Sequence, residues 1–215
     1  MKKYRYILEH PILWTVNQII KLFFKNSFFI KAINYQNYVS FDFWFIQKIL
    51  NIGGNKNAYW PVHYSSKVVY PERILVGIDT SPGIMKGCYI QGEGGIDIGD
   101  YTQVAPNVVI VSSNHDVYDS RFSIQKKVVI GKYCWLGAGC KILPGVTLGD
   151  FTIVGAGAVV TKSFPEGYCI IGEVPAKKLK ELEIERCDRY EFEPKFHGYI
   201  PEKNFDNYRK KHLNI

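Results

Sequence analysis

The stretch IGKYCWLGAGCKILPGVTLGDFTIVGAGAVVTKSFP, from Ile130 to Pro165, repeats a pattern every six residues. Each hexad opens on Ile, Leu or Val, glycine or alanine often follows, and the fifth place holds mostly Thr, Val, Cys or Ala. A weaker phase of the same period precedes it, around Val76 and again from Ile98. So strict a short period indicates a repeat architecture, which must be recognised before any helix or strand is assigned.

Three hexads are the length of one turn of a parallel β-helix, with a strand on each of three sides. The leading aliphatic side chains then point inward, the small fifth residue fits a narrow interior, and glycine near the corners supplies backbone freedom. No helical period of 3.6 residues interrupts residues 130–163, which argues against a sheet built from alternating strands and helices. The sequence predicts a mainly β fold, a β-helix of hexapeptide repeats.

The six-residue pattern is lost between Asn107 and Ile130, around a histidine. A polar loop cannot fit inside the β-helix, so residues 114–129 must project outward at a corner. Loops on a rigid scaffold often carry function, and His115 lies at the root of this one. Histidine titrates near neutrality and can act as a general base, although a surface-loop histidine need have no chemical role.

These features resemble the hexapeptide-repeat acyltransferases with a left-handed parallel β-helix, most closely those that O-acetylate sugars or bacterial surface polysaccharides. The resemblance covers residues 61–179 and rests on VAPNVV, the NHD loop, YCWLGAGCKILPGV, VGAGAVVTKSFPEG and GEVPAKKLK. It implies a homotrimer with sites between subunits, in which an acetyl group passes from acetyl-CoA to a hydroxyl or amine.

The resemblance also assigns roles to residues near the interrupted hexads. His115 corresponds to the general base, and Asp116 is expected to orient it, with Asp119 as an alternative. Backbone N–H groups at Gly137 or Ala138 correspond to the donors that stabilise the tetrahedral oxyanion. Trp135 is expected to form a wall of the same cleft, or to cover a corner of the β-helix against the next subunit.

Acetyl-CoA binding is expected toward the C-terminal end of the repeats. The pantetheine arm is expected along Gly155 and Ala156, and the phosphates are expected near Thr161, Lys162, Lys177 and Lys178, of which the lysines supply positive charge. A solvated basic face is the alternative interpretation of these lysines. No metal site is predicted, because the five cysteines form no CxxC pair and are interpreted as reduced packing residues of a cytoplasmic protein.

The acceptor is expected to be a saccharide of capsule or lipopolysaccharide biosynthesis. A sugar-binding asparagine of some relatives would fall near residues 88–91, where none stands, so Tyr89, Gln91 and Asn114 are the candidate acceptor contacts. N-acetylation of a nucleotide-linked amino sugar is the nearest rival function. Acetylation of serine or another small molecule, and a β-helix that is only a scaffold, are further alternatives.

The chain has 215 residues, 47% of them hydrophobic, and a formal net charge of +7. The excess charge fits CoA phosphates, an anionic acceptor or a membrane surface, and no nucleic-acid-binding motif accompanies it. We expect a segment at 1–58 that is helical and rich in aromatic residues, the β-helix at 59–178, and a C-terminal helix and tail at 179–215.

Within the first segment, Ile12–Lys25 is expected to form an amphipathic helix that caps the β-helix. The alternative is peripheral contact with the inner face of the membrane, helped by Lys21, Lys25 and Lys31. No uncharged apolar run reaches the ~18 residues of a membrane span.

Overall fold

The computed structural model describes Thr15, Ile19 and residues 39–215. The amphipathic helix expected at Ile12–Lys25 lies outside the described residues, apart from Thr15 and Ile19. Within the part of the chain that the structure describes, no helix has the length and hydropathy needed to cross a membrane.

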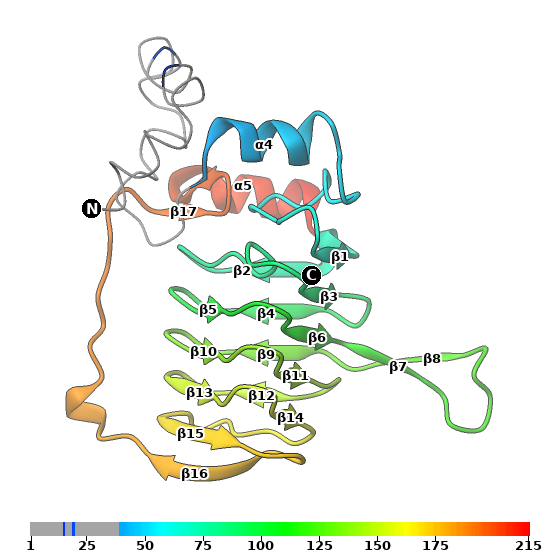
Figure 1. Cartoon of the computed structure of the whole chain (residues 1–215), viewed down its shortest axis with the longest axis vertical. Coiled ribbons are helices and arrows are strands. Elements are labelled where there is room, and N and C mark those ends of the chain that lie inside the picture. The colour runs from blue at the N-terminus through cyan, green and yellow to red at the C-terminus, as the bar shows by residue number, and fades with distance from the viewer. Residues whose placement is uncertain (1–14, 16–18, 20–38) are drawn as a thin grey trace.

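Residues 67–176 wind into a stack of turns, and each turn adds strands to three sheets that are parallel within this stack (Figure 1). The first sheet has the order β1-β3-β6-β11-β14 and the second the order β2-β4-β9-β12. The third has the order β5-β10-β13-β15-β16, in which β16 is antiparallel. The strands of the first sheet are β1 (Lys67–Val69), β3 (Tyr89–Gln91), β6 (Val109–Val111), β11 (Lys141–Ile142) and β14 (Val159–Val160). Those of the second are β2 (Ile74–Val76), β4 (Ile96–Ile98), β9 (Val128–Ile130) and β12 (Thr147–Leu148). Those of the third are β5 (Gln103–Val104), β10 (Trp135–Leu136), β13 (Thr152–Val154), β15 (Cys169–Gly172) and β16 (Lys177–Glu181).

The strand register confirms that three hexads make one turn. Trp135 pairs with Ile153 and Lys141 with Val159, so paired residues are eighteen positions apart. Val109, however, pairs with Lys141, a separation of 32 residues, because the loop around His115 is inserted in that turn. The insertion leaves the stacking of the strands above and below it intact.

The inward side chains follow the predicted positions. The leading aliphatic residues of the hexads are buried, namely Ile130, Leu136, Ile142, Leu148, Val154 and Val160. Small fifth-place residues are buried as well, namely Cys134, Cys140, Val146, Thr152 and Ala158. Phe164 is a larger fifth-place residue and lies in the last turn, where fewer strands follow.

Glycine at the second place of the hexads is required because neighbouring turns approach closely there. It does not supply the special backbone angle that was expected of corner glycines from the sequence. A Cβ atom at Gly131 would lie 2.6 Å from the backbone nitrogen of Asp150 in the next turn. The left-handed backbone angles at this corner belong instead to Tyr101, Tyr133, Phe151 and Tyr168, with φ between 46° and 58°. Aromatic residues accept this strained conformation because they stack on one another there.

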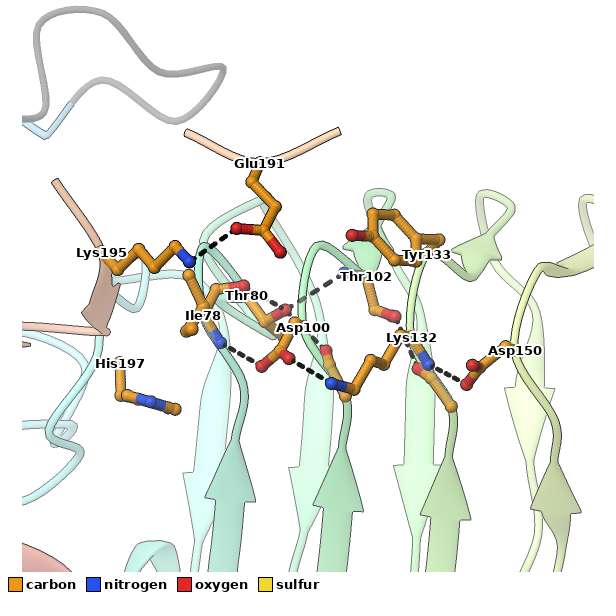
Figure 2. Close-up of polar contacts among 12 residues, drawn as sticks. Ile78, Thr80, Asp100, Thr102, Lys132, Tyr133, Asp150, Glu191, Lys195 and His197 are labelled. Carbon is orange, nitrogen blue, oxygen red and sulfur yellow. Dashed lines mark hydrogen bonds and ion pairs between the residues drawn. The ribbon is translucent and has the colours of Figure 1, made fainter. Parts of the chain in front are cut away.

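The stacked aromatic rings form a ladder along the corner between the second and third sheets. Ring centroids are 5.3 Å apart between Tyr101 and Tyr133, and 4.9 Å apart between Tyr133 and Phe151. Figure 2 shows the polar contacts beside this ladder, where Asp100 accepts from Ile78 N and pairs with Lys132 Nζ, both at 2.8 Å. Polar and aromatic contacts therefore link successive turns at the same corner.

A C-terminal strap, residues 183–195, runs back along the stack toward the first turn (Figure 1). Its side chains contact the aromatic ladder. Tyr190 packs edge-on against Tyr101 and Tyr133, and its carbonyl accepts from the Tyr133 hydroxyl at 3.1 Å. The strap begins with a short 3-10 helix, Ile184–Arg186, and leads to β17 (Phe196–His197), β18 (Ile200–Pro201) and α5 (Glu202–His212).

Two helices, α4 (Phe41–Lys48) and α5, cover the first turn of the stack (Figure 1). Side chains, in place of a further strand, form hydrogen bonds with backbone groups at the open edge of that turn. Asn55 donates to Ser66 O and accepts from Val68 N, while the Tyr59 hydroxyl donates to Ile74 O and accepts from Val76 N. An unpaired strand edge is an aggregation hazard, and this cap removes it.

Candidate active site

Residues 113–125 of the interrupted hexads form a β-hairpin that projects from the stack (Figure 1). Val128 and Val129, which were expected from the sequence to lie in the projecting loop, belong to β9 within the stack. Strand β7 (Ser113–His115) continues from β6, turns, and returns as β8 (Ser123–Gln125) before β9 begins. The hairpin leaves at the corner between the first and second sheets. Its tip exposes apolar side chains, with Tyr118 96% exposed.

His115 is exposed at the end of β7, and its ring is held by the loop that follows. Its Nδ1 atom lies 2.7 Å from the backbone carbonyl oxygen of Ser120. A carbonyl can only accept, so Nδ1 carries the proton in the neutral ring and Nε2 is its basic atom. A ring held in this tautomer can accept a proton at Nε2.

The carboxylates beside His115 shape the loop. Asp116 Oδ1 accepts from the backbone N–H groups of Tyr118 and Asp119, at 2.8 and 3.0 Å. Asp119 pairs with Arg121 at 2.7 Å, and the hydrogen bond from Arg121 lowers the pKa of Asp119. The Nδ1 atom of His115 contacts the backbone carbonyl of Ser120, whereas the sequence predicted a carboxylate as its partner. The sequence could not indicate this contact, because every residue has a backbone carbonyl.

Of the candidate acceptor contacts, Gln91 and Asn114 lie at the base of the hairpin, whereas Tyr89 lies at the start of β3, toward the other edge of the first sheet. Tyr89 is exposed on β3, and Asn114 is exposed on β7. Gln91, at the end of β3, contacts Ser113 Oγ and donates to Glu93 Oε2 at 3.1 Å. The hairpin base thus brings Gln91 and Ser113 together from neighbouring turns.

Trp135 lies on the third sheet and is 55% exposed. It borders a cavity of about 220 Å³ whose other lining residues include Ile84, Met85, Gln103 and Pro106. The cavity walls are mainly apolar side chains and backbone, so this part of the surface can take an apolar chain.

The glycine-rich candidates lie where the chain passes from the third sheet to the first. Gly137 follows β10, and its N–H donates to Val154 O at 2.8 Å. Gly155 follows β13 one turn later, and its N–H donates to Ile171 O at 2.8 Å. Ala138 and Ala156, the residues after them, are exposed. Within one chain this corner and the hairpin lie at opposite edges of the first sheet.

The candidate phosphate contacts, one hydroxyl and three lysines, lie at the far end of the stack. Thr161 and Lys162 are exposed after β14, and Lys162 Nζ lies 5.7 Å from the centre of the Phe164 ring. Lys177 pairs with Glu173 at 3.3 Å and Lys178 with Glu181 at 2.9 Å. These pairs are exposed and therefore weak, so an anionic ligand can displace the carboxylates.

Comparison with known proteins agrees with the repeat. Residues 127–162 match the family described as bacterial transferase hexapeptide, six repeats. The chain is 34% identical over 118 residues to Escherichia coli K12 WcaF, named for acetyl transfer in colanic acid biosynthesis, covering 54% of this chain and 63% of that protein. Galactoside O-acetyltransferase of the same strain is 34% identical over 94 residues, covering 40% and 44% of the two chains.

Among solved structures, a galactoside acetyltransferase in complex with coenzyme A has a TM-score of 0.52 and 27% identity, covering 61% of this chain and 66% of that one. The chain thus spans between 44% and 63% of the length of the two sequence relatives above. Residues 127–162 thus match the bacterial transferase hexapeptide repeats, and the stack that contains them is similar to that of a galactoside acetyltransferase.

Proposed function

We propose that this protein transfers an acetyl group from acetyl-CoA to a hydroxyl of a saccharide, with His115 as the general base. The observation that carries the proposal is the fixed ring of His115, whose Nδ1 lies 2.7 Å from Ser120 O at the base of an exposed hairpin. The galactoside acetyltransferase with a similar stack was solved with coenzyme A, which supports the donor.

His115 Nε2 takes the proton of the acceptor hydroxyl as its oxygen attacks the acetyl carbonyl carbon. The carbon–sulfur bond then breaks, and the CoA thiolate receives that proton from the imidazolium. The Ser120 carbonyl keeps the ring in one orientation throughout, which is the contribution that positioning makes to such a step. Asp116 acts in this scheme by holding the loop that carries Ser120.

Ala138 is the better of the two proposed oxyanion donors. The N–H group of Gly137 is already bonded to Val154 O within the stack, whereas Ala138 is exposed at the turn. A Cβ atom at Gly137 would lie 2.6 Å from Val154 O, so glycine keeps the two turns close together. Gly155 and Ala156 extend the same edge by one turn, which suits an extended pantetheine arm.

The phosphates of CoA are proposed to lie near Thr161, Lys162, Lys177 and Lys178. All four residues are exposed, and the three lysines among them supply positive charge that attracts phosphate groups. Trp135 and its cavity are proposed to form part of the same groove.

A homotrimer is proposed because one chain separates the two halves of the site. His115 leaves one edge of the first sheet, and the turn of Gly137 and Ala138 lies at the other. A neighbouring copy can bring its own glycine-rich corner against the hairpin. We also propose that the β-helix is left-handed and occupies residues 59–178, between an N-terminal segment and a C-terminal tail. The protein is proposed to be cytoplasmic.

The acceptor is proposed to be a saccharide of surface-polysaccharide biosynthesis, contacted by Tyr89, Gln91 and Asn114. WcaF is named for colanic acid biosynthesis and the galactoside enzyme for its sugar, which favours a hydroxyl acceptor. N-acetylation of an amino sugar is the second candidate. We favour capping of the stack by the N-terminal segment over membrane contact. In support, α4 of that segment packs at the first turn, where the Gln47 side chain bonds to Trp60 O and Val62 N.

The test is release of free CoA from acetyl-CoA, measured with a panel of saccharides and amino sugars. Wild-type protein should show acceptor-dependent release, and His115→Ala should lower kcat by roughly 10²- to 10⁴-fold, the usual contribution of a general base. His63→Ala is the matched control, because His63 lies in the first turn and contacts Ser65. Equal turnover of wild type and His115→Ala would remove His115 from the mechanism.

A further inference from the structure

The carboxylate of Glu93 bridges the two strands of the projecting hairpin. Glu93 Oε2 accepts from Ser113 Oγ on β7 at 2.6 Å and from Ser123 Oγ on β8 at 3.1 Å. Its Oε1 accepts from Gln125 Nε2, also on β8, at 3.4 Å. One side chain therefore contacts both strands.

Glu93 is itself fixed to the stack. It lies in the GEGG turn before β4, and its carbonyl accepts from Arg73 Nη1 at 2.6 Å. The next residue, Gly94, donates its N–H to Ser112 Oγ at 2.8 Å. The hydrogen bond from Ser113 lowers the pKa of Glu93, so the carboxylate is ionised at neutral pH and accepts strongly. The contacts of Glu93, called here the clamp, therefore connect the exposed hairpin to the stack.

His115 lies on the same face of the hairpin as the residues that Glu93 contacts. Ser113 pairs with Gln125 and His115 with Ser123, and residues two apart on a strand point to the same side. Bonds from Asp116 N to Phe122 O and from Lys126 N to Ser112 O alternate with these pairs. Both pairs are thus of the non-hydrogen-bonded kind, in which side chains approach most closely.

We propose that Glu93 is a positioning residue, which holds the register of the hairpin and so keeps His115 in place; this rests on the function proposed above. A two-stranded hairpin is marginally stable alone in water. A slip of one residue would turn His115 to the opposite face and remove Ser120 O from its ring. The carboxylate across both strands opposes that slip.

The first test compares Glu93→Ala with Glu185→Ala, an exposed carboxylate on the short helix of the strap. Glu93→Ala should lower kcat roughly tenfold to a hundredfold, as misplaced catalytic groups do, and leave KM for acetyl-CoA unchanged. Hydrogen exchange should accelerate at the amides of Asp116 and Lys126 but not at Gly131, which is bonded within the stack. This second readout needs no activity, so it separates failure of the clamp from failure of the proposed function.

The second test asks whether register alone explains the loss. In the Glu93→Ala background, Ser113→Cys and Gln125→Cys place a disulfide across a non-hydrogen-bonded pair, where the geometry suits it. Oxidation should restore kcat to within about threefold of wild type, and reduction should abolish the recovery, because the bond replaces the clamp. Wild-type kcat in Glu93→Ala would overturn the proposal. So would a low kcat that oxidation does not restore, because Glu93 would then act on the substrate itself.

Discussion

At the residue scale, the corner between the second and third sheets combines strain with burial. Asp79 adopts φ of 50° in the first turn, and its N–H donates to Phe196 O at 3.1 Å. Burial of the carboxyl group raises the pKa of Asp79 to about 6. Burial disfavours the charged form of Asp79 in the folded protein. At any pH where Asp79 ionises, it therefore lowers the free energy of unfolding.

Asp79→Asn should therefore raise the Tm at pH 7.5. Asparagine keeps the backbone bond, tolerates the left-handed conformation and carries no charge. The sign follows from the raised pKa: the folded protein binds the proton more tightly than the unfolded chain, so the cost of Asp79 grows as pH rises from the ordinary value of 3.8 through about 6.

Thermal unfolding at pH 4 and 7.5 checks this, with Asp206→Asn on the exposed side of α5 as the control. The gain in Tm for Asp79→Asn should shrink toward zero at pH 4. An equal gain at both pH values would show that the backbone preference, and not the charge, causes it.

At the scale of elements, the strap and the aromatic ladder stabilise each other. The strap has little regular structure of its own between Arg186 and Phe196, so its position depends on contacts such as those of Tyr190. Each turn after the first offers one ring at the corner, and Tyr190 of the strap contacts two of these rings. The ladder thus links repeats that otherwise contact only their neighbours.

Tyr190→Ala should lower the free energy of unfolding by about 1 to 3 kcal/mol, because it removes two edge-on ring contacts and part-buried apolar area. Urea unfolding measures the loss, and Tyr64→Ala, at an exposed ring outside the strap, is the control. A strap that served only as a linker would give equal values for the two variants.

At the scale of the whole molecule, the stack separates the proposed catalytic groups within one chain, which is why the proposed site needs a neighbouring copy. His115 and Ala138 come from opposite edges of one sheet. A site between copies would use His115 of one chain and the glycine-rich corner of the next.

Mixing of inactive variants tests this arrangement. His115→Ala and Ala138→Pro, which removes the proposed N–H donor, should each be inactive alone. Co-expressed, they should regain about a quarter of wild-type kcat, because random assembly in a cyclic oligomer pairs two intact halves at one interface in four. Circular dichroism checks that the proline variant folds, and absence of recovery would place both halves of the site in one chain.

The sequence alone determined the stack of parallel turns, because inward packing demands a small or aliphatic residue at the same places in every hexad. It also predicted a projection beside His115, since a polar loop cannot enter that interior and must interrupt the period. The backbone freedom predicted for the corner glycines is confirmed at Gly139, Gly145 and Gly157, where φ lies between 68° and 83°. At Gly131 the constraint is instead the neighbouring turn.

Only the tertiary structure gave the contacts of His115 with Ser120 and of Glu93 with the hairpin, the strap across the aromatic ladder, and the side chains of Asn55 and Tyr59 that complete the first turn. These contacts join residues that follow no common period, and one of them uses a backbone carbonyl that every residue possesses. A repeat can be recognised in a sequence because every turn meets the same packing requirement, whereas a single long-range contact occurs once and leaves no pattern.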